Sequence, residues 1–437
     1  MKHLLLQLSI LAAVSASAQA PVQDDVVTLN DKDYTISTII DRELGPGVRY
    51  TRLRVPDYPL NVNLLRVDVT NPNVSVETTQ AFDTLYRTEL LTEAAVRRSS
   101  EGHQALAGAN ANFWCVRPQP PYSDWLVGAT YNGNLANGKI ITEINTHGDQ
   151  FHGGIKATGV LAVTRDNPPK VISANNWSFK GMLKSDKFDR DEEIYQVNKI
   201  VRDEEMDIYN SYYGADRQFL CIEPYKDEDN QLRWRQLPDC ATEVYLTLDD
   251  GQQWLTSTDI VFTVADVKQS AGNGTLGSYD LAIVGRGSRA LTLDKLAKGD
   301  KVTLTYDFID GEGRPTRTHN LVGGNSQVMI NGELTKYNDI FDYNSLVYSR
   351  TGYGTDAEGK ILYIIVIDKV ADPVYGTSAG CPTNVMCQIA RHYGCTEMTN
   401  FDAGGSAEML VGDRIVNKTT EATPRPVANG MIIYNTK

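Results

Sequence analysis

The sequence predicts an α+β fold of mixed, mostly antiparallel β-sheets flanked by a few helices. Short β-compatible segments recur from residue 243 onward, as in TEVYLTL, DIVFTV, YDLAIVG and KVTLTYDF, and turn sequences such as DDG, AGNG and KGD separate them. Many short strands with regular turns are typical of antiparallel sheets. A helical period is clear at two places, so we expect few helices.

The N-terminal region is expected to consist mainly of strands. Residues 26–40 alternate in the manner of a hairpin whose turn lies at 30–33. Residues 60–70 and 74–79 are two more predicted strands, and the NPN between them predicts a turn. Apolar residues spaced three and four apart then predict a helix over 88–99.

The C-terminal region combines strands with a second helix. Residues 349–355 and 358–369 are predicted to form two strands joined by a turn at 357–359. A helix is predicted over 382–393, because proline is favourable at the first helical position and Gly394 ends the apolar pattern.

Composition divides the chain into regions. We expect a β-rich region with one helix at 21–100 and a larger domain at 101–437. Within that domain, residues 175–242 are rich in Asp, Glu, Lys, Arg and Tyr, with charge runs such as DRDEE and RDEEMD. The spacing of an EF-hand calcium loop is missing from these runs. The segment therefore predicts a polar, solvated insertion.

The first twenty residues have the pattern of a secretory signal. Lys2 and His3 precede an apolar run from Leu4 to Val14, and small residues end the segment at Ala20. The run is shorter than the roughly 20 residues that a membrane-spanning helix needs, and no later apolar run is longer. The sequence predicts an exported protein, periplasmic or secreted, with no membrane span and with its oligomeric state left open.

The overall charge argues against a nucleic-acid partner. The formal net charge is −13 at pH 7, and the chain contains no basic tract. Binding to a phosphate backbone depends mainly on Lys and Arg. An acidic envelope also repels small anions, so a phosphate site on this chain would need arginines placed locally.

The six cysteines are an even number in a chain predicted to be exported. Fifteen pairings of six cysteines exist, and the sequence does not choose among them. Cys221 with Cys240 is the most plausible local bridge, because it would close a polar segment with little core of its own. Zinc is not expected, since the cysteines and histidines lack zinc-ligand spacing.

The stretch NFDAGGS, Asn400 to Ser406, follows a predicted strand at 396–401. A carboxylate at a strand end, followed by two glycines, places free backbone amides beside Asp402 and Ser406. A tight β-turn is the other interpretation, because Asp, Gly and Ser are the usual turn formers. Polar residues elsewhere in the chain, in similar sequence contexts, favour a functional site over a simple turn.

The sequence segments that carry these residues, taken in chain order, resemble those of the phosphodiester glycosidase family. The resemblance covers roughly residues 105–434, interrupted by the polar insertion. It depends on the following pieces: NANFW from Asn110, VGATYNG from Val127, VGGNSQVMINGEL from Val322, SRTGYGTDAEGKILYIIVID from Ser349, SAGCPTNVMCQIARHYGC from Ser378, NFDAGGSAEMLV from Asn400 and RPVANGMIIY from Arg425.

The resemblance implies which positions carry function. They are Asn110, the neighbouring Asn112, Arg350, Thr351, Asp368, Gly380, Asp402, Gly404, Gly405, Ser406, Arg425, Pro426 and Asn429. Three positions differ from the family pattern. Ala403 replaces the first glycine of the turn, Glu408 replaces a small hydroxyl residue, and Lys369 replaces a glycine. Alanine at 403 predicts that this position either does not need a positive φ or carries backbone strain.

The family activity implied is hydrolysis of a sugar 1-phosphodiester to free sugar and a phosphomonoester, with a phosphorylated carbohydrate as the partner. Arg350 and Arg425 suit the phosphate, because a guanidinium holds two of its oxygens with parallel bonds. Asp402 suits the role of base or nucleophile, with Glu408 or Asp368 as its partner. The backbone amides of residues 404–406 are placed to hold an oxyanion.

Two alternatives stay open at this stage. A non-catalytic glycan-binding or cell-envelope protein on the same fold would use Trp114, Tyr122 and Trp125 for stacking. A hydrolase with Ser406 as nucleophile lacks the GxSxG elbow and a nearby histidine. No cofactor is expected to be required, although Asp402 and Asp368 could supply oxygen ligands to a divalent cation such as calcium.

Overall fold

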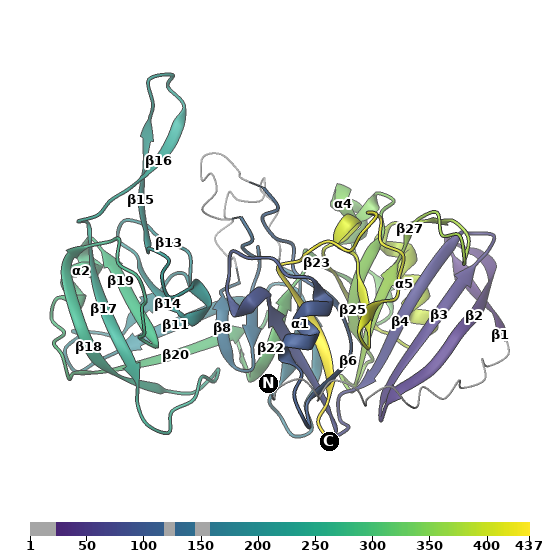
Figure 1. Ribbon diagram of the computed structural model, residues 1–437, viewed down its shortest axis with the longest axis horizontal. Coiled ribbons are helices and arrows are strands. Elements are labelled where there is room, and N and C mark those ends of the chain that lie inside the picture. The colour runs from purple at the N-terminus through teal and green to yellow at the C-terminus, as the bar shows by residue number, and fades with distance from the viewer. Residues whose placement is uncertain (1–22, 118–126, 145–157) are drawn as a thin grey trace, which may run out of the picture.

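The computed structural model describes residues 23–117, 127–144 and 158–437. Its sheets follow one another along the long axis of the molecule (Figure 1). The strands numbered from β11 to β20 lie at one end, and β1 to β4 lie at the other. The signal sequence predicted at 1–20 lies outside the described residues. Mostly antiparallel sheets with few short helices confirm the predicted fold class.

The largest sheet has nine antiparallel strands in the order β1-β2-β3-β4-β26-β25-β29-β23-β24. Their bounds are β1 (Gln23–Leu29), β2 (Lys32–Gly45), β3 (Val48–Val55), β4 (Leu60–Asp68), β23 (Ser326–Ile330), β24 (Glu333–Leu334), β25 (Arg350–Thr355), β26 (Ile361–Ile367) and β29 (Glu397–Asn400). Gly352 of β25 is opposite Asn400 of β29. This antiparallel register brings the start of β25 beside the stretch that follows β29.

A five-stranded sheet in the order β31-β30-β6-β32-β5 supplies the other strand ends of the candidate site. Its strands are β5 (Val74–Gln80), β6 (Gln104–Asn110), β30 (Met409–Val411), β31 (Arg414–Ile415) and β32 (Asn429–Asn435). Ala109 of β6 pairs with Met409, and Asn110 pairs with Gly430. The end of β6 therefore lies between the starts of β30 and β32.

A second five-stranded sheet, β10-β9-β22-β7-β8, packs against these two. Its strands are β7 (Asn134–Ala136), β8 (Lys139–Thr142), β9 (Val160–Thr164), β10 (Val171–Ala174) and β22 (Thr318–Gly323). Leu161 and Val322 from this sheet share one buried cluster with Ala107 and Tyr353. One hydrophobic core thus joins elements from distant parts of the sequence.

The eight-stranded sheet at the far end of the molecule has the order β12-β11-β20-β18-β17-β19-β14, with β21 paired to β20. Its strands are β11 (Ser178–Lys184), β12 (Glu192–Ile194), β14 (Met206–Asn210), β17 (Ala241–Leu248), β18 (Ile260–Ala271), β19 (Leu281–Arg286), β20 (Lys301–Ile309) and β21 (Pro315–Thr316). A projecting hairpin, β15 (Leu220–Lys226) with β16 (Leu232–Gln236), joins β13 (Ile200–Val201).

The polar segment predicted at 175–242 differs from a solvated insertion. Its strand β11 pairs with β20, and its strand β14 pairs with β19. Leu183 and Ile208 from this segment are buried in the largest core cluster of that end. Most residues of the charged runs lie in turns or are exposed, although Glu192 and Asp207 are buried, so composition alone concealed the buried residues of these strands. The domain boundary predicted near residue 100 stays a prediction, although β4 pairs with β26 and β5 with β32.

The helices are short. They are α1 (Leu91–Arg98), α2 (Ser288–Leu293), α3 (Tyr337–Ile340), α4 (Asp342–Ser345) and α5 (Thr383–His392). The hairpin and helices predicted at 26–40, 88–99 and 382–393 are present, with α1 starting three residues later than predicted. In α5, Val385, Met386 and Ile389 pack against the large sheet.

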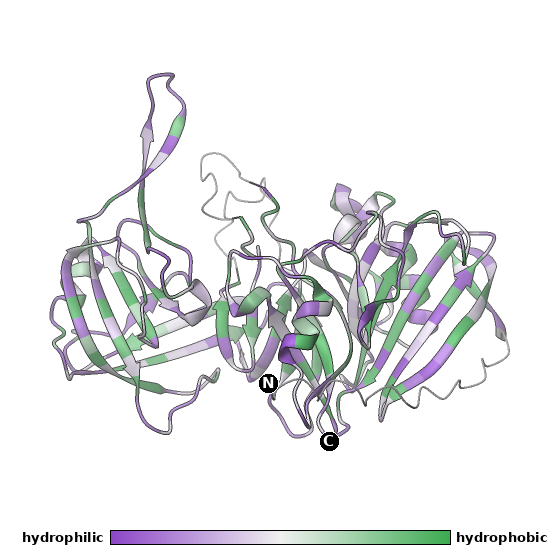
Figure 2. Ribbon diagram, viewed as in Figure 1, coloured by the Kyte–Doolittle hydropathy of each residue, from purple (hydrophilic) through white to green (hydrophobic). Residues whose placement is uncertain are grey.

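Hydropathy follows this architecture. Apolar residues gather in the strands, and most connecting loops are hydrophilic (Figure 2). None of the helices in the described part of the chain is both long and apolar enough to span a bilayer. Two short strands, β27 (Lys369–Val370) and β28 (Ser378–Ala379), pair with each other next to the C-terminal end of β26.

The cysteines are free thiols in this structure. Cys221 and Cys240 are nevertheless neighbours, close enough for a thiol-to-thiol hydrogen bond. The predicted bridge between them remains a prediction.

Candidate active site

Asp402 lies where strands of two sheets meet. Its backbone N–H donates to the carbonyl of Ala111 over 3.0 Å, and its carbonyl accepts from the Asn110 side-chain amide over 2.7 Å. The preceding residue, Phe401, donates its N–H to the carbonyl of Thr351 over 3.0 Å. Two separate chain segments, the end of β6 and the start of β25, therefore fix the backbone that carries this carboxylate.

The surroundings of Asp402 set its protonation. Its side chain is partly exposed, yet burial raises the pKa to about 6, against the opposing effects of the Ser406 hydroxyl, the Ala403 N–H and Arg425. The Ala403 N–H donates to Oδ1 over 3.0 Å. At neutral pH the carboxylate is thus mostly ionised, as a general base or nucleophile must be.

Gly404 and Gly405 are required in the turn for different structural reasons. Gly404 has a φ of +66°, in the left-handed region that favours glycine. A Cβ at Gly405 would contact the Arg425 guanidinium and Glu421. Ala403 has an extended backbone with φ −133°, which confirms that this position needs no positive φ. Residues 404–406 form a short 3₁₀ turn, η5.

Glu408 is the second carboxyl group of the site, and it is fully buried. Its Oε1 accepts the backbone N–H of Arg425 over 2.6 Å, while Oε2 has no hydrogen-bond partner among the described residues. Burial raises the pKa of Glu408 to about 8, against the effect of Arg425. A protonated Glu408 at neutral pH would have a proton to donate.

Arg425 is close to both carboxyl groups. Its backbone contacts Glu408, its Nη1 is 3.4 Å from the Ser406 hydroxyl, and its charge lowers the pKa of Asp402. The guanidinium also forms an ion pair with Glu421, whose hydrogen bond raises the pKa of Arg425. Its side chain is partly exposed, so it is the predicted phosphate-binding arginine that solvent can reach.

Arg350 is in a different environment from Arg425. It is fully buried, and its Nε donates to the carbonyl of Cys381 over 2.9 Å. Its Nη2 lies within hydrogen-bond distance of the carbonyls of Tyr343, Asn344 and Leu346. Nη1 has no partner, and no carboxylate pairs with this guanidinium in the part of the chain that the structure describes. In this conformation Arg350 fixes the loop before β25.

The predicted binding asparagines are all engaged inside the protein. Asn110 Oδ1 accepts from the Thr351 hydroxyl over 2.9 Å and from the Glu408 N–H over 3.0 Å. Asn112 Oδ1 accepts from the Gly323 N–H over 3.0 Å and from the Asn429 amide over 2.9 Å. The structure thus brings Asn110, Asn112, Thr351 and Asn429 together as the frame around the carboxyl groups.

Asp368 belongs to a neighbouring polar cluster. It is buried, and its Oδ2 lies 3.7 Å from Arg52 and 3.3 Å from the Lys418 N–H. Burial raises the pKa of Asp368 to about 7, and Arg52 opposes this shift. Arg52 also pairs with Asp372, whose Oδ2 lies 3.4 Å from the Arg52 guanidinium.

The calcium site suggested for Asp402 and Asp368 stays a prediction. Within residues 23–117, 127–144 and 158–437, no set of three or more Asp, Glu, His or Cys side chains is arranged to hold a metal ion.

Several aromatic side chains lie near Asp402, including Trp114, which the sequence singled out. The charge of Asp402 acts on Tyr131 and Tyr343, and burial raises the pKa of both. Tyr343 meets the Phe113 ring edge to face at 5.3 Å. Trp114 lies close enough to lower the pKa of Asp402, yet its Nε1–H has no hydrogen-bond partner in the described ranges. No motif pointed to Tyr343, and the predicted stacking residues Tyr122 and Trp125 lie outside the described residues.

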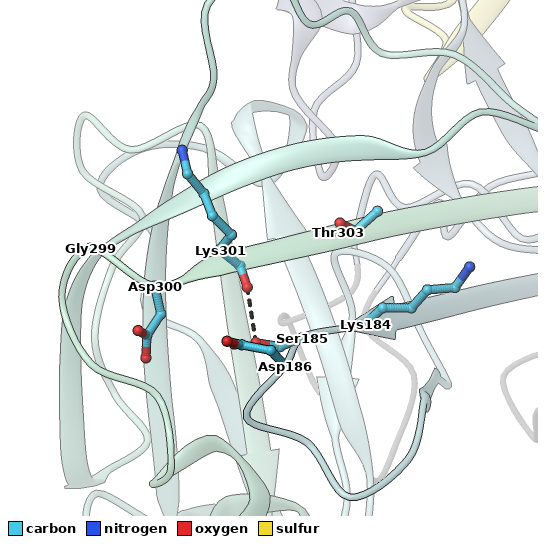
Figure 3. Close-up of a pocket in the computed structure, with 7 residues that line it drawn as sticks. All are labelled: Lys184, Ser185, Asp186, Gly299, Asp300, Lys301 and Thr303. Carbon is cyan, nitrogen blue, oxygen red and sulfur yellow. Dashed lines mark hydrogen bonds between the residues drawn. The ribbon is translucent and has the colours of Figure 1, made fainter.

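A surface hollow elsewhere is separate from this site. It lies where β11 ends and β20 begins, and there the Ser185 hydroxyl donates to the carbonyl of Lys301 over 2.9 Å (Figure 3). The side chains of Lys184 and Lys301 extend in different directions there. Its lining is Lys184, Ser185, Asp186, Gly299, Asp300, Lys301 and Thr303. None of the predicted site residues is among them.

Two solved bacterial structures have a similar fold, and a third match, from zebrafish, has a lower TM-score. A hypothetical protein from Synechocystis has 12% identity and a TM-score of 0.61, covering 95% of this chain and 68% of that one. A Burkholderia pseudomallei protein named "Putative exported protein" has 16% identity and a TM-score of 0.59, covering 86% and 74%. Zebrafish N-acetylglucosamine-1-phosphodiester alpha-N-acetylglucosaminidase, solved as its catalytic domain auto-inhibited by the pro-peptide, has 10% identity and a TM-score of 0.39, covering 94% and 81%.

Sequence comparison matches a smaller part of the chain than the structural comparison does. No curated protein gives a significant match to this chain. The family model described as phosphodiester glycosidase matches residues 258–434. The match includes Arg350, Asp402 and Arg425 but not Asn110. Over residues 258–434 the chain therefore carries a domain of the phosphodiester glycosidase family.

Proposed function

We propose that this protein is an exported hydrolase that cleaves the glycosidic bond of a sugar 1-phosphodiester, releasing free sugar and a phosphomonoester. The observation that carries the proposal is the arrangement of two carboxyl groups about one arginine. Asp402, with a pKa of about 6, and Glu408, with a pKa of about 8, both lie next to Arg425. The family domain at 258–434 supports the substrate class.

In the proposed reaction, Asp402 accepts a proton from water while the water oxygen bonds to the anomeric carbon. The bond from that carbon to the phosphate oxygen breaks, and its electron pair stays on the phosphate. Arg425 balances the charge, and Glu408 can donate its proton to the leaving oxygen. Attack by Asp402 itself, followed by hydrolysis, is the other route.

The remaining residues would act by holding this arrangement. Asn110 and Thr351 connect the backbone segments of Asp402 and Glu408. Arg350 would position the loop at 343–346 and would not touch the phosphate. Positioning contributes strongly to catalysis. Loss of the Asn110 and Thr351 bonds, or of the Arg350 bonds to the loop, should therefore reduce turnover as well as stability.

The test is incubation of the purified protein with a panel of nucleotide sugars and sugar 1-phosphodiesters, with released reducing sugar as the readout. We expect turnover of at least one member and a loss of about 10²-fold or more in Asp402→Asn. Asp413→Asn, an exposed turn aspartate with 82% side-chain exposure, is the matched control. Full activity of Asp402→Asn would overturn the proposed role.

A non-catalytic glycan-binding protein is the second candidate. It is favoured by the ion pair between Arg425 and Glu421 and by the rings of Tyr131 and Tyr343 near Asp402. Calorimetric titration with the same panel separates the two. Binding without release of reducing sugar would favour the binding protein, and release would favour the enzyme.

A further inference from the structure

We propose that the aglycone of the substrate, the group that the phosphate links to the sugar, is an aliphatic chain. We also propose that the site continues into a surface that binds this chain. This surface, the apolar strip, consists of Tyr343, Tyr348, Leu346, Val347 and Ile340. The proposal rests on the proposed function, since it names the substrate class of the same site: a sugar 1-phosphodiester with an alkyl or lipid aglycone.

The strip begins at the catalytic carboxylate. Tyr343 is close enough to Asp402 to respond to its charge and to the backbone of Ala403. The Tyr343 ring stacks on Tyr348, with centroids 5.3 Å apart and an interplanar angle of 25°. Two adjoining rings thus form a path that leads from Asp402 towards residues 346 and 347.

The far part of the strip is unusually exposed for aliphatic residues. Leu346 is 49% exposed, Val347 45% and Ile340 58%. Ile340 ends α3, and Leu346 and Val347 belong to the segment between α4 and β25, which lies before Arg350. Grouped exposed aliphatic side chains often mark a binding surface, whereas single ones are common on any protein. Val347 is followed directly by Tyr348, so the exposed aliphatic residues meet the two rings at that point of the chain.

The backbone under the strip is fixed from behind. Asn344 Oδ1 accepts from the Asn325 amide over 2.8 Å, and its Nδ2 donates to the Ser326 hydroxyl over 2.9 Å. Arg350 holds the carbonyls at 343, 344 and 346. The exposed side chains are therefore presented on a preorganised loop, which lowers the entropy cost of binding a ligand.

A positive charge beside the apolar strip favours an alkyl ligand that carries a negative charge. The Lys369 ammonium donates to the carbonyl of Val347 over 2.7 Å and lies 5.3 Å from the Tyr348 ring centroid. It has no carboxylate partner in the described part of the chain. A cation beside Val347 and Tyr348 complements the single negative charge of an alkyl phosphodiester. A neutral glycan would leave that cation unused.

The test measures kcat/KM for sugar 1-phosphodiesters with methyl, octyl and dodecyl aglycones, in submicellar solution. We expect the wild-type value to rise about tenfold or more from methyl to octyl, since each buried methylene favours binding. The double variant Leu346→Gln/Val347→Gln should lose most of that rise, measured within the variant as the ratio of its octyl to its methyl kcat/KM. Leu291→Gln, in α2 and 67% exposed, is the matched control and should behave as wild type.

A binding experiment separates failure of the strip from failure of the proposed function. Dodecyl phosphate, titrated calorimetrically, should bind wild type and Leu291→Gln and bind the double variant at least about tenfold more weakly. That result without any diester turnover would end the proposed function but leave the strip. Turnover with no dependence on chain length would end the strip. Sedimentation of the wild type with phosphatidylcholine vesicles, without chain-length dependence, would make the surface a membrane contact and also overturn the proposal.

Discussion

The side-chain amide of Asn110 donates a hydrogen bond of 2.7 Å to the backbone carbonyl of Asp402, across 292 positions of sequence. The oxygen of the same amide accepts from the Glu408 N–H and from the Thr351 hydroxyl. One buried side chain therefore fixes the backbone of both carboxyl-bearing residues. Its replacement would leave several buried polar groups without partners.

Asn110→Ala should lower the free energy of unfolding by about 2–4 kcal/mol, because each buried polar group left unpaired costs about 1–3 kcal/mol. Thr351→Val removes only one of these bonds and should cost about 1 kcal/mol. Urea denaturation followed by circular dichroism measures both. Thr28→Val, which removes an exposed hydrogen bond to Asp33, is the control and should change little. Equal stability of Asn110→Ala and wild type would show that this amide is not a structural tie.

Strand patterns and turn residues were sufficient to predict the fold class. The hairpin at 26–40 and the helix at 382–393 depend on local periodicity, which the sequence displays directly. A turn after the strand predicted at 396–401 was also predictable, because Asp, Gly and Ser are the usual turn formers, whereas the functional role of this stretch stays a prediction. Its turn has a glycine with positive φ at Gly404.

The roles of Arg350 and Asp368 could not be predicted in the same way. Arg350 is buried because the α3–α4 segment folds over it and turns three carbonyls towards its guanidinium, a contact that depends on tertiary packing. Asp368 meets Arg52 because β26 pairs with β4, and β4 pairs with β3. Long-range strand pairing determines both environments, and residue type alone does not reveal it.

The two glycines of the turn predict contrasting variants. Gly405→Ala would push its new Cβ against the flexible end of Arg425. We expect stability to change little and KM for a sugar phosphodiester to rise about tenfold, because the cation moves. Gly404→Ala meets no atom within 4 Å but must adopt a φ of +66°. It should cost about 1 kcal/mol of stability from backbone strain, with a smaller effect on KM.

Thermal melts and steady-state kinetics on the two glycine variants check this contrast. Gly412→Ala provides a strain control, since Gly412 has a φ of +64°, has no atom within 4 Å of its Cβ and lies outside the site. Its melting temperature should fall as in Gly404→Ala, with KM unchanged. The opposite pattern, with Gly405→Ala unstable and kinetically normal, would contradict the placement of Arg425 beside the substrate.

The two carboxyl groups predict a bell-shaped pH profile. Below a pH of about 6, Asp402 becomes protonated and loses its ability to act as base. Above a pH of about 8, Glu408 ionises and loses the proton that it would donate. We therefore expect kcat/KM to be highest between these values and to fall on both sides.

Glu408→Gln tests the alkaline limb of that profile. An amide cannot donate the proton, so kcat/KM should be lower at neutral pH, by about 10²-fold, and should no longer fall near pH 8. Glu358→Gln, at an exposed position with 65% side-chain exposure, should keep the full profile. An unchanged alkaline limb in Glu408→Gln would assign that limb to another group.

Burial of Glu408 also predicts how stability depends on pH. The pKa of Glu408 is raised from 4.5 to about 8, so between these values the folded protein holds a proton that the unfolded chain has lost. The stabilising contribution is present below pH 4.5 and is lost as pH rises towards 8. Since each pKa unit is worth about 1.4 kcal/mol, the wild type should lose roughly 3 kcal/mol relative to Glu408→Gln between pH 5 and 8. Urea midpoints of both proteins across this range measure the difference, in which the contributions of Asp402 and Asp368 cancel. Parallel curves would mean that Glu408 is ionised in the folded protein, and the proposed proton donor would then have to be a different residue.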